Sequence, residues 1–163
     1  MTEPKVEFFT LKRTLLYGGD RDVFDEANVK KVYEFEAKLR KEDNVPDNDV
    51  FLTAVAEEML CVQVDEKVVG KVEYLIRNEK CNIMWFNAPG FGEFILTELE
   101  SILREQKVVL IELLCTLSGS EDDATCLRRL NFYMHRGFSA KKLFYGNDSH
   151  RQAYTKLSLF KKL

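Results

Sequence analysis

The stretch from Asn82 to Cys115 constrains the fold of this chain more than any other. A β-type run, Asn82–Phe86, is followed by a glycine-containing loop and then by Gly90–Gln106, whose apolar residues have helical spacing. Val108–Cys115 comes next and is nearly all apolar, which is typical of a strand covered on both faces. Strand, loop, helix and strand in this order predict a parallel crossover within a mixed sheet.

The flanking segments complete a predicted element order of β-α-β-β-β-α-β-α-β-β. Apolar spacing predicts helices over Asp22–Lys41, Gly90–Gln106 and Ala124–Arg136, and Gly137 closes the last of them. Polar turns at Asp65–Lys67 and Arg77–Lys80 separate three β-rich runs, and the polar loop Glu42–Asp49 follows the first helix. The predicted strands are Val6–Leu11, Met59–Val64, Val68–Ile76, Asn82–Phe86, Val108–Cys115, Ser139–Tyr145 and Gln152–Phe160. We therefore expect a single mixed α/β domain over residues 1–163, with an antiparallel front half and helices on both faces of the sheet.

Composition and charge narrow the classes of partner. The formal net charge is −3, which does not favour the phosphates of nucleic acid, so no nucleic-acid partner is expected. No segment approaches the ~18 consecutive apolar residues of a membrane helix, and the first residues lack the apolar core of a signal peptide. We expect a cytoplasmic protein without a membrane partner, and a nuclear location is left open.

The cysteines predict neither a metal site nor disulfides. None of the 4 cysteines forms a Cys-x-x-Cys pair, and the chain has only 2 histidines, His135 and His150. Tetrahedral zinc sites need ligands in tight pairs, so no metal is expected. Cys61 and Cys115 lie inside apolar runs and are predicted to be small core residues.

Two short motifs are the best candidates for chemistry. The loop Asn87-Ala88-Pro89-Gly90-Phe91-Gly92 leaves a strand and opens a helix, where free amide groups suit an anion such as pyrophosphate. The segment from Phe132-Tyr133 to Gly137-Phe138 ends the last helix and begins a strand. Each motif also has a structural explanation, a tight strand-to-helix turn for the first and a capped helix with core aromatics for the second.

The element order and these motifs together resemble the GCN5-related N-acetyltransferase superfamily over about Met59–Phe160. Val68-Val69-Gly70 is similar to that family's entry to the third strand, and Asn87-x-x-Gly90-x-Gly92 is similar to its acetyl-CoA loop, with Asn in place of Gln or Arg. Phe132-Tyr133 with Gly137-Phe138 is similar to its aromatic-Tyr-x-x-x-Gly-Phe signature. The resemblance implies acetyl transfer from acetyl-CoA, by direct attack, to an amine acceptor: a small molecule, a polyamine or a protein amino group.

The resemblance also implies roles for particular residues. Tyr133 is the expected general acid for the departing thiolate. The cofactor-binding positions it implies are Met84, Trp85, Phe86, Asn87, Gly90, Phe91, Gly92 and Glu93.

Glu112 is the second catalytic candidate, because it is the only carboxylate in the apolar run Val108–Cys115. A buried carboxylate is costly unless it is paired, so Glu112 is either functional or held in an ion pair. His135 is expected to lie on the helix surface, and Trp85 in the core or the wall of a pocket.

A second resemblance provides the alternative function. Ornithine decarboxylase antizyme has a similar fold and no acetyl-CoA loop. Its helix resembles the stretch from Glu121-Asp122 through Leu127-Arg128 into Gly137-Phe138. This resemblance implies a catalytically inactive protein that binds or regulates a protein partner. The acidic stretch Ser118–Asp123 then either attracts a polycation or is a solvated loop.

Overall fold

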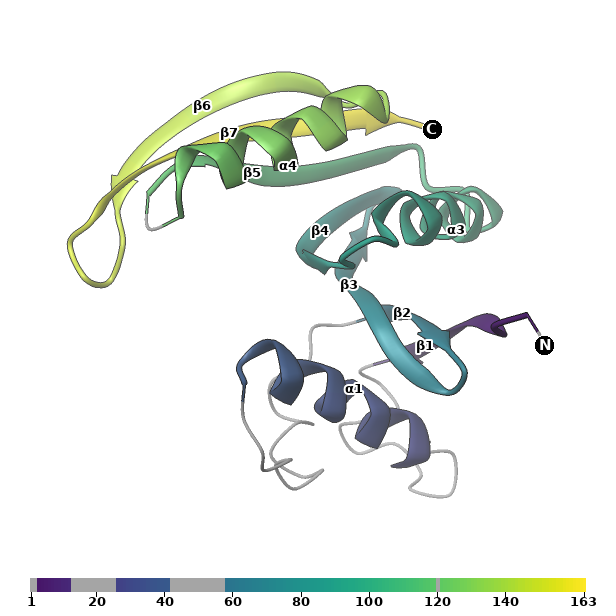
Figure 1. Cartoon of the computed structure of the whole chain (residues 1–163). Helices are drawn as coiled ribbons and strands as arrows, with labels where there is room; N and C mark the ends of the chain where they lie inside the picture. Colours follow the sequence, from purple (N-terminus) through teal and green to yellow (C-terminus); the bar gives the residue numbers. More distant parts are fainter. Residues whose placement is uncertain (1–2, 13–25, 42–57, 120) are drawn as a thin grey trace. The chain divides into compact units, whose positions relative to one another are not determined.

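The computed structural model describes residues 3–12, 26–41, 58–119 and 121–163 (Figure 1). The predicted order of elements is confirmed: β1 (Val6–Lys12), α1 (Glu26–Leu39), β2 (Glu58–Val64), β3 (Lys67–Arg77), β4 (Lys80–Asn87), α3 (Gly92–Glu105), β5 (Leu110–Ser118), α4 (Asp123–His135), β6 (Ser139–Asn147) and β7 (Ala153–Lys162). The predicted start of the first helix before Glu26 and the loop Glu42–Asp49 lie outside the described residues.

The strands form one mixed sheet in the order β1-β2-β3-β4-β5-β7-β6. β4 and β5 pair in parallel, from Lys80 opposite Leu110 to Ile83 opposite Leu113. β1 with β2, β2 with β3, β5 with β7 and β6 with β7 pair antiparallel. The predicted mixed α/β fold and its parallel crossover are therefore confirmed.

The contacts divide the chain into two compact units. The first contains Met1–Leu75 and Met84–Ser101, and the second contains Ile76–Ile83 and Ile102–Leu163. Both β4 and α3 contribute residues to each unit.

In the first unit, helices lie on both faces of the β1–β2 pair. Phe9 and Leu11 of β1, opposite Cys61 and Met59 of β2, share a core with Val29, Val32, Tyr33 and Phe35 of α1. Phe8 points to the other face, because successive side chains of a strand alternate. Its ring stacks on Phe94 of α3 with centroids 5.3 Å apart. The prediction of helices on both faces is confirmed here.

One charged group is buried between α1 and the sheet. Lys71 of β3 is 4% exposed and forms an ion pair with Glu36 of α1, and its Nζ lies 3.8 Å from an oxygen of Glu73. Lys71 stands opposite Cys61 in the register of β2 and β3. The ion pair satisfies a charge that would be costly alone in this apolar layer.

The two hairpin turns of the antiparallel part are tighter than predicted. Asp65 and Glu66 have φ of 48° and 67°, and Asn78 and Glu79 have φ of 50° and 63°. Two consecutive positive φ values are typical of a two-residue type I′ turn, whose twist matches that of the flanking strands. Lys67, predicted to be in the turn, instead pairs with Val64 and begins β3.

In the second unit, α4 runs along β5 (Figure 1). Ile111, Leu113 and Cys115 alternate along β5 and are buried. On the opposite face Leu114 is 56% exposed, so the prediction of a strand covered on both faces is wrong for β5. An apolar run alone does not reveal whether a second layer covers the strand.

We predict that Gly70→Ala destabilises the fold. A Cβ at Gly70 would lie 2.6 Å from the Cβ and 2.9 Å from the Cα of Ala88, so backbone would have to move. We expect the free energy of unfolding in urea to fall by about 1–3 kcal/mol, the usual cost of overpacking. Gly146→Ala is the matched control. Its Cβ would meet the end of the Tyr154 side chain, 2.6 Å from the hydroxyl oxygen, which can rotate away at a smaller cost. An equal loss in both variants would contradict the close-packing role of Gly70.

Candidate functional site

The loop between β4 and α3 has the geometry of an anion site. The Phe91 N–H donates to the Ala88 carbonyl at 2.9 Å, and the Ile95 N–H donates to the Phe91 carbonyl at 3.0 Å. Gly90 has φ of +77°, a left-handed conformation that favours glycine, and no atom lies within 4 Å of where its Cβ would be. The amide of Gly92 lies in the first turn of α3, where amides have no intrahelical partner. This arrangement suits a phosphate group.

The end of β4 that leads into this loop is apolar and open. Met84 is 58% exposed and Trp85 is 54% exposed, and as neighbours in a strand they point to opposite faces. Trp85 is therefore not a core residue, one of the two placements considered for it. Phe86 and Asn87 are partly buried. Exposed large apolar side chains beside a loop of this kind are typical of a binding surface.

Glu93 is the residue of this region that least suits an anion. It is exposed and lies in the first turn of α3, where its carboxylate interacts favourably with the helix dipole. The same charge opposes a phosphate at the loop. Helix stability explains the presence of Glu93, and ligand binding does not.

Tyr133 lies on the buried face of α4 and is 5% exposed. Its ring makes edge contacts with Phe132 and Phe138 at centroid distances of 5.3 Å and 5.5 Å. Its carbonyl accepts hydrogen bonds from the Arg136 and Phe138 amides at the end of the helix. The structural explanation of the motif, a capped helix with core aromatics, is therefore confirmed, and the catalytic role stays a prediction.

Burial raises the pKa of Tyr133 to about 12, and the side chain of Cys115 adds to this effect. The guanidinium of Arg129 acts in the opposite direction. At neutral pH the Tyr133 hydroxyl is thus protonated, which is the state that a general acid needs.

Glu112 forms an ion pair with Lys141 of β6, with an N–O distance of 3.3 Å. Its side chain is 30% exposed, so it is not the fully buried carboxylate that the apolar run predicts. Glu112 and Cys115 point to opposite faces of β5, because they are an odd number of positions apart along an alternating strand. The side chain of Cys115 raises the pKa of Tyr133, so Tyr133 lies near the face of β5 that carries Cys115. The structure therefore does not bring the two predicted catalytic residues together, and the ion-paired alternative describes Glu112 as observed.

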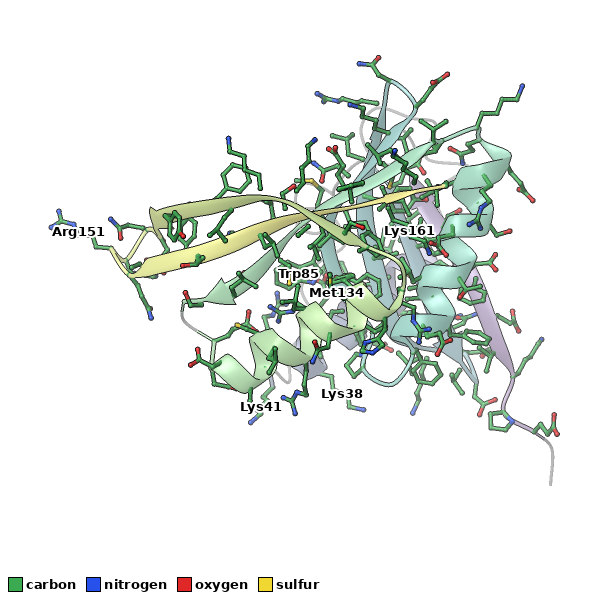
Figure 2. All side chains as sticks on the ribbon, turned by 90° about the horizontal axis from the view of Figure 1, so that it is seen from above. Lys38, Lys41, Trp85, Met134, Arg151 and Lys161 are labelled. Carbon is green, nitrogen blue, oxygen red and sulfur yellow. The ribbon has the colours of Figure 1, made fainter. Side chains whose placement is uncertain are left out.

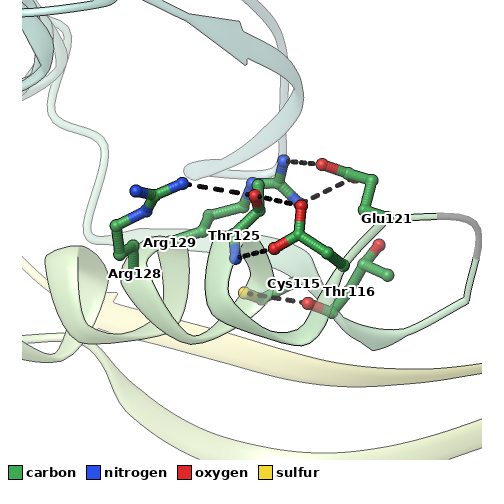
Figure 3. A network of polar contacts seen from close by, with 7 residues as sticks. Cys115, Thr116, Glu121, Thr125, Arg128 and Arg129 are labelled. Atoms are coloured by element: carbon green, nitrogen blue, oxygen red, sulfur yellow. Dashed lines mark hydrogen bonds and ion pairs between the residues drawn. The ribbon is translucent and has the colours of Figure 1, made fainter.

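A polar network at the start of α4 contains residues that the sequence did not single out (Figure 3). Arg129 donates two hydrogen bonds to Glu121, at 3.0 Å and 2.6 Å. This pairing raises the pKa of Arg129 and lowers the pKa of Glu121. Asp122 caps the helix by accepting from the Thr125 amide at 2.8 Å. Two carboxylates of the stretch Ser118–Asp123 thus have structural partners.

The spacing of Arg129 and Tyr133 was the available signal that Arg129 lies near the candidate general acid. The two residues are four apart on a helix, so they lie one turn apart on the same side. The link between Glu121 and Arg129 spans eight residues across the helix start, and no helical periodicity predicts it.

The remaining polar candidates have plain structural roles. His135 is exposed and its Nδ1 lies 2.7 Å from the Asn131 carbonyl oxygen, so its predicted surface position is confirmed. The cysteines are free and buried, and burial raises the pKa of the Cys115 thiol, which makes it a poor nucleophile. Within the described ranges, His, Cys, Asp and Glu form no cluster of three or more that could hold a metal. Among the same residues, no helix is long and apolar enough to cross a membrane.

Solved structures of acetyltransferases share this fold. The ribosomal-protein-S18-alanine N-acetyltransferase from Escherichia coli is 11% identical with a TM-score of 0.61, covering 96% of this chain and 94% of that chain. The ribosomal-protein-alanine N-acetyltransferase from Brucella melitensis is 14% identical with a TM-score of 0.61, and the match covers 96% of this chain and 99% of that chain. The aminoglycoside 6'-N-acetyltransferase from Enterococcus faecium is 9% identical with a TM-score of 0.64, and the match covers 97% of this chain and 96% of that chain.

Sequence comparison adds nothing to this likeness. No protein-family model matches the chain, and no curated protein gives a significant match. The chain therefore has the fold of the GCN5-related N-acetyltransferases, as its motifs predicted. At these identities the likeness establishes the fold.

We predict that ionisation of Tyr133 contributes to alkaline unfolding. A tyrosine whose pKa is 10.0 when unfolded and about 12 when folded stabilises the protein fully below pH 10. That contribution is lost as the pH rises through 12. Urea unfolding across this range should show a loss in wild type that exceeds the loss in Tyr133→Phe by roughly 1–3 kcal/mol. Tyr145→Phe, at a tyrosine that is 75% exposed, is the control. Parallel curves for wild type and Tyr133→Phe would show that the hydroxyl is not buried in solution.

Proposed function

We propose that the protein transfers an acetyl group from acetyl-CoA to an amine acceptor. The single observation that carries the proposal is the left-handed Gly90 loop at the carboxyl end of β4, which opens directly into α3. The shared fold of the acetyltransferases supports it. The acceptor class, the use of acetyl-CoA and a cytoplasmic location all belong to this proposal.

Acetyl-CoA supplies an activated thioester whose acetyl carbon the acceptor nitrogen attacks, forming a C–N bond while the C–S bond breaks. In this proposal the amides of Gly90 and Gly92 bind the pyrophosphate, while the Phe91 amide holds the loop in shape through its bond to the Ala88 carbonyl. Backbone N–H groups of Met84–Phe86 polarise the carbonyl oxygen, as donors do in an oxyanion hole.

Tyr133 has the proton for the departing thiolate in this proposal. The acceptor amine must lose its own proton to a base, directly or through one water. Glu112 is placed less well for that task, because it is already paired with Lys141.

One observation favours the second candidate, an inactive protein like the antizymes that binds a protein partner. Glu93 places a negative charge in the first turn of α3, beside the amides that would receive the pyrophosphate. The solved structures named above bring no support to this candidate. This second candidate becomes the preferred function if acetyl-CoA does not bind.

We predict that acetyl-CoA raises the midpoint of thermal unfolding and that Glu93→Lys strengthens the effect. Binding to the native state stabilises it by mass action. Replacing a negative by a positive charge beside the pyrophosphate should lower the Kd about tenfold at a moderate salt concentration of about 0.1 M. Isothermal calorimetry provides the Kd for each variant.

Glu105→Lys is the matched control for this experiment. It changes the net charge equally at the other end of α3, which is 12 residues and therefore about 18 Å away. That distance exceeds the Debye length of about 10 Å at moderate salt, so the Kd should stay near that of wild type. If acetyl-CoA shifts no midpoint and calorimetry detects no binding in either variant, the acetyltransferase proposal fails.

We predict that Tyr133→Phe lowers kcat by about 100-fold or more with little change in the KM for acetyl-CoA. The substitution keeps the ring and its contacts with Phe132 and Phe138, while it removes the proton that a general acid supplies. Turnover is measured as thiol release with a panel of small amines, polyamines and peptides. Tyr145→Phe is the control. Full turnover with a lowered unfolding midpoint would assign Tyr133 to the core alone, since losing one hydrogen bond costs about 1 kcal/mol.

A further inference from the structure

The charge of this chain is segregated at its C-terminal end. Residues 139–163, which contain β6 and β7, carry 6 lysines and arginines against 1 aspartate, whereas the whole chain has a net charge of −3. Arg151 lies at the far tip of the β6–β7 hairpin (Figure 2). A basic hairpin on an otherwise acidic chain is a surface that attracts anionic groups.

The same hairpin exposes apolar side chains on the edge of the sheet. β6 is the last strand in the sheet order, so one side of its backbone has no neighbouring strand within the described sheet. Leu143 is 40% exposed, Phe144 is 39% exposed and Tyr145 is 75% exposed. Three consecutive large side chains that are open to solvent on an edge strand favour association with another chain.

Lys142 and Lys156 lie next to that edge, where their ammonium groups can bind carboxylates. Lys142 lies over the Phe144 ring at 5.0 Å, and Lys156 lies over the Tyr154 ring at 4.8 Å. Lys156 is directly opposite Phe144 in the register of β6 and β7, so Lys142, Phe144 and Lys156 share one face of the hairpin. Carboxylates on alternate residues of an added strand would all meet that face.

We propose that the free edge of β6 binds an extended acidic peptide as an added strand. Main-chain hydrogen bonds to the edge supply affinity, and the lysines select glutamate or aspartate at alternate positions. No residue of this surface belongs to the Gly90 loop, and the proposal does not depend on acetyl transfer.

Two other occupants fit the surface less well. A second copy of the chain would bring one basic hairpin against another, because a two-fold interface places the same patch on both sides. A single-stranded nucleic acid needs open aromatic faces for stacking. The faces of Phe144 and Tyr154 carry lysine ammonium groups instead.

The experiment titrates the whole chain with a fluorescent peptide of alternating glutamate and valine and follows anisotropy at low salt. We expect saturable binding that weakens as salt is added. Lys142→Glu combined with Lys156→Glu should raise the Kd about tenfold or more. Lys30→Glu combined with Lys38→Glu, at exposed positions of α1, changes the net charge equally and should leave the Kd near that of wild type.

Further arms separate the possible results. The same peptide N-methylated at every residue has no main-chain N–H to donate to an edge strand and should bind at least tenfold more weakly. A peptide of alternating lysine and valine should not bind. Absence of saturable binding by the glutamate peptide overturns the proposal. Tighter binding of oligouridylate than of the glutamate peptide would also overturn the proposal. A dimer that forms with rising protein concentration in sedimentation and excludes the peptide would do the same. Equal effects of the two charge-reversed pairs would also overturn it.

Discussion

The parallel pairing of β4 with β5 is the constraint on which the rest of the structure depends. Two parallel neighbours cannot be joined by a tight turn, so the chain must leave the sheet at the end of β4 and return to the start of β5. Helix α3 makes that return. The crossover places a helix N-terminus at the carboxyl end of a strand, where α/β folds commonly bind ligands. Gly90 provides the left-handed residue that the loop into α3 requires.

Strand β5 separates two chemical environments in the second unit. Toward α4, Cys115 and Tyr133 lie in an apolar layer where burial raises the pKa of both side chains. On the opposite face Glu112 stays partly exposed and is paired with Lys141. Side chains two residues apart on such a strand share an environment, while adjacent ones do not. A carboxylate and a phenol on one strand–helix unit therefore need not belong to one site.

The order of elements could be predicted because each has a clear periodicity. The prediction for Val108–Cys115 shows that periodicity does not predict which faces of a strand are covered. Its apolar residues indicated a strand, but local hydrophobicity does not say whether a second layer covers it, and Leu114 proved to be exposed. For Glu112 the sequence left two alternatives, and only the register of β5, β7 and β6 brought Lys141 within reach.

The candidate site was predictable to a similar extent. The Gly90 loop was identified because glycines at a strand-to-helix junction let the backbone come close to a ligand, although a tight turn also explained them. The network of Arg129 with Glu121 depends on how the segment before α4 turns back on the helix, which no local pattern encodes. The burial of Tyr133 agrees with both of its proposed roles, as a core aromatic and as a general acid.

The ion pair of Lys71 with Glu36 makes the docking of α1 selective. Apolar side chains alone would let a helix slide or rotate on the sheet, because hydrophobic contact has no direction. A charge buried at one point removes that freedom, because a shift of α1 by one turn would take Glu36 away from Lys71 and leave that lysine only the 3.8 Å contact with Glu73. Breaking such a pair typically costs about 3–5 kcal/mol, enough to exclude the shifted arrangements. Glu36 thus fixes the position of α1 along its own axis relative to β3.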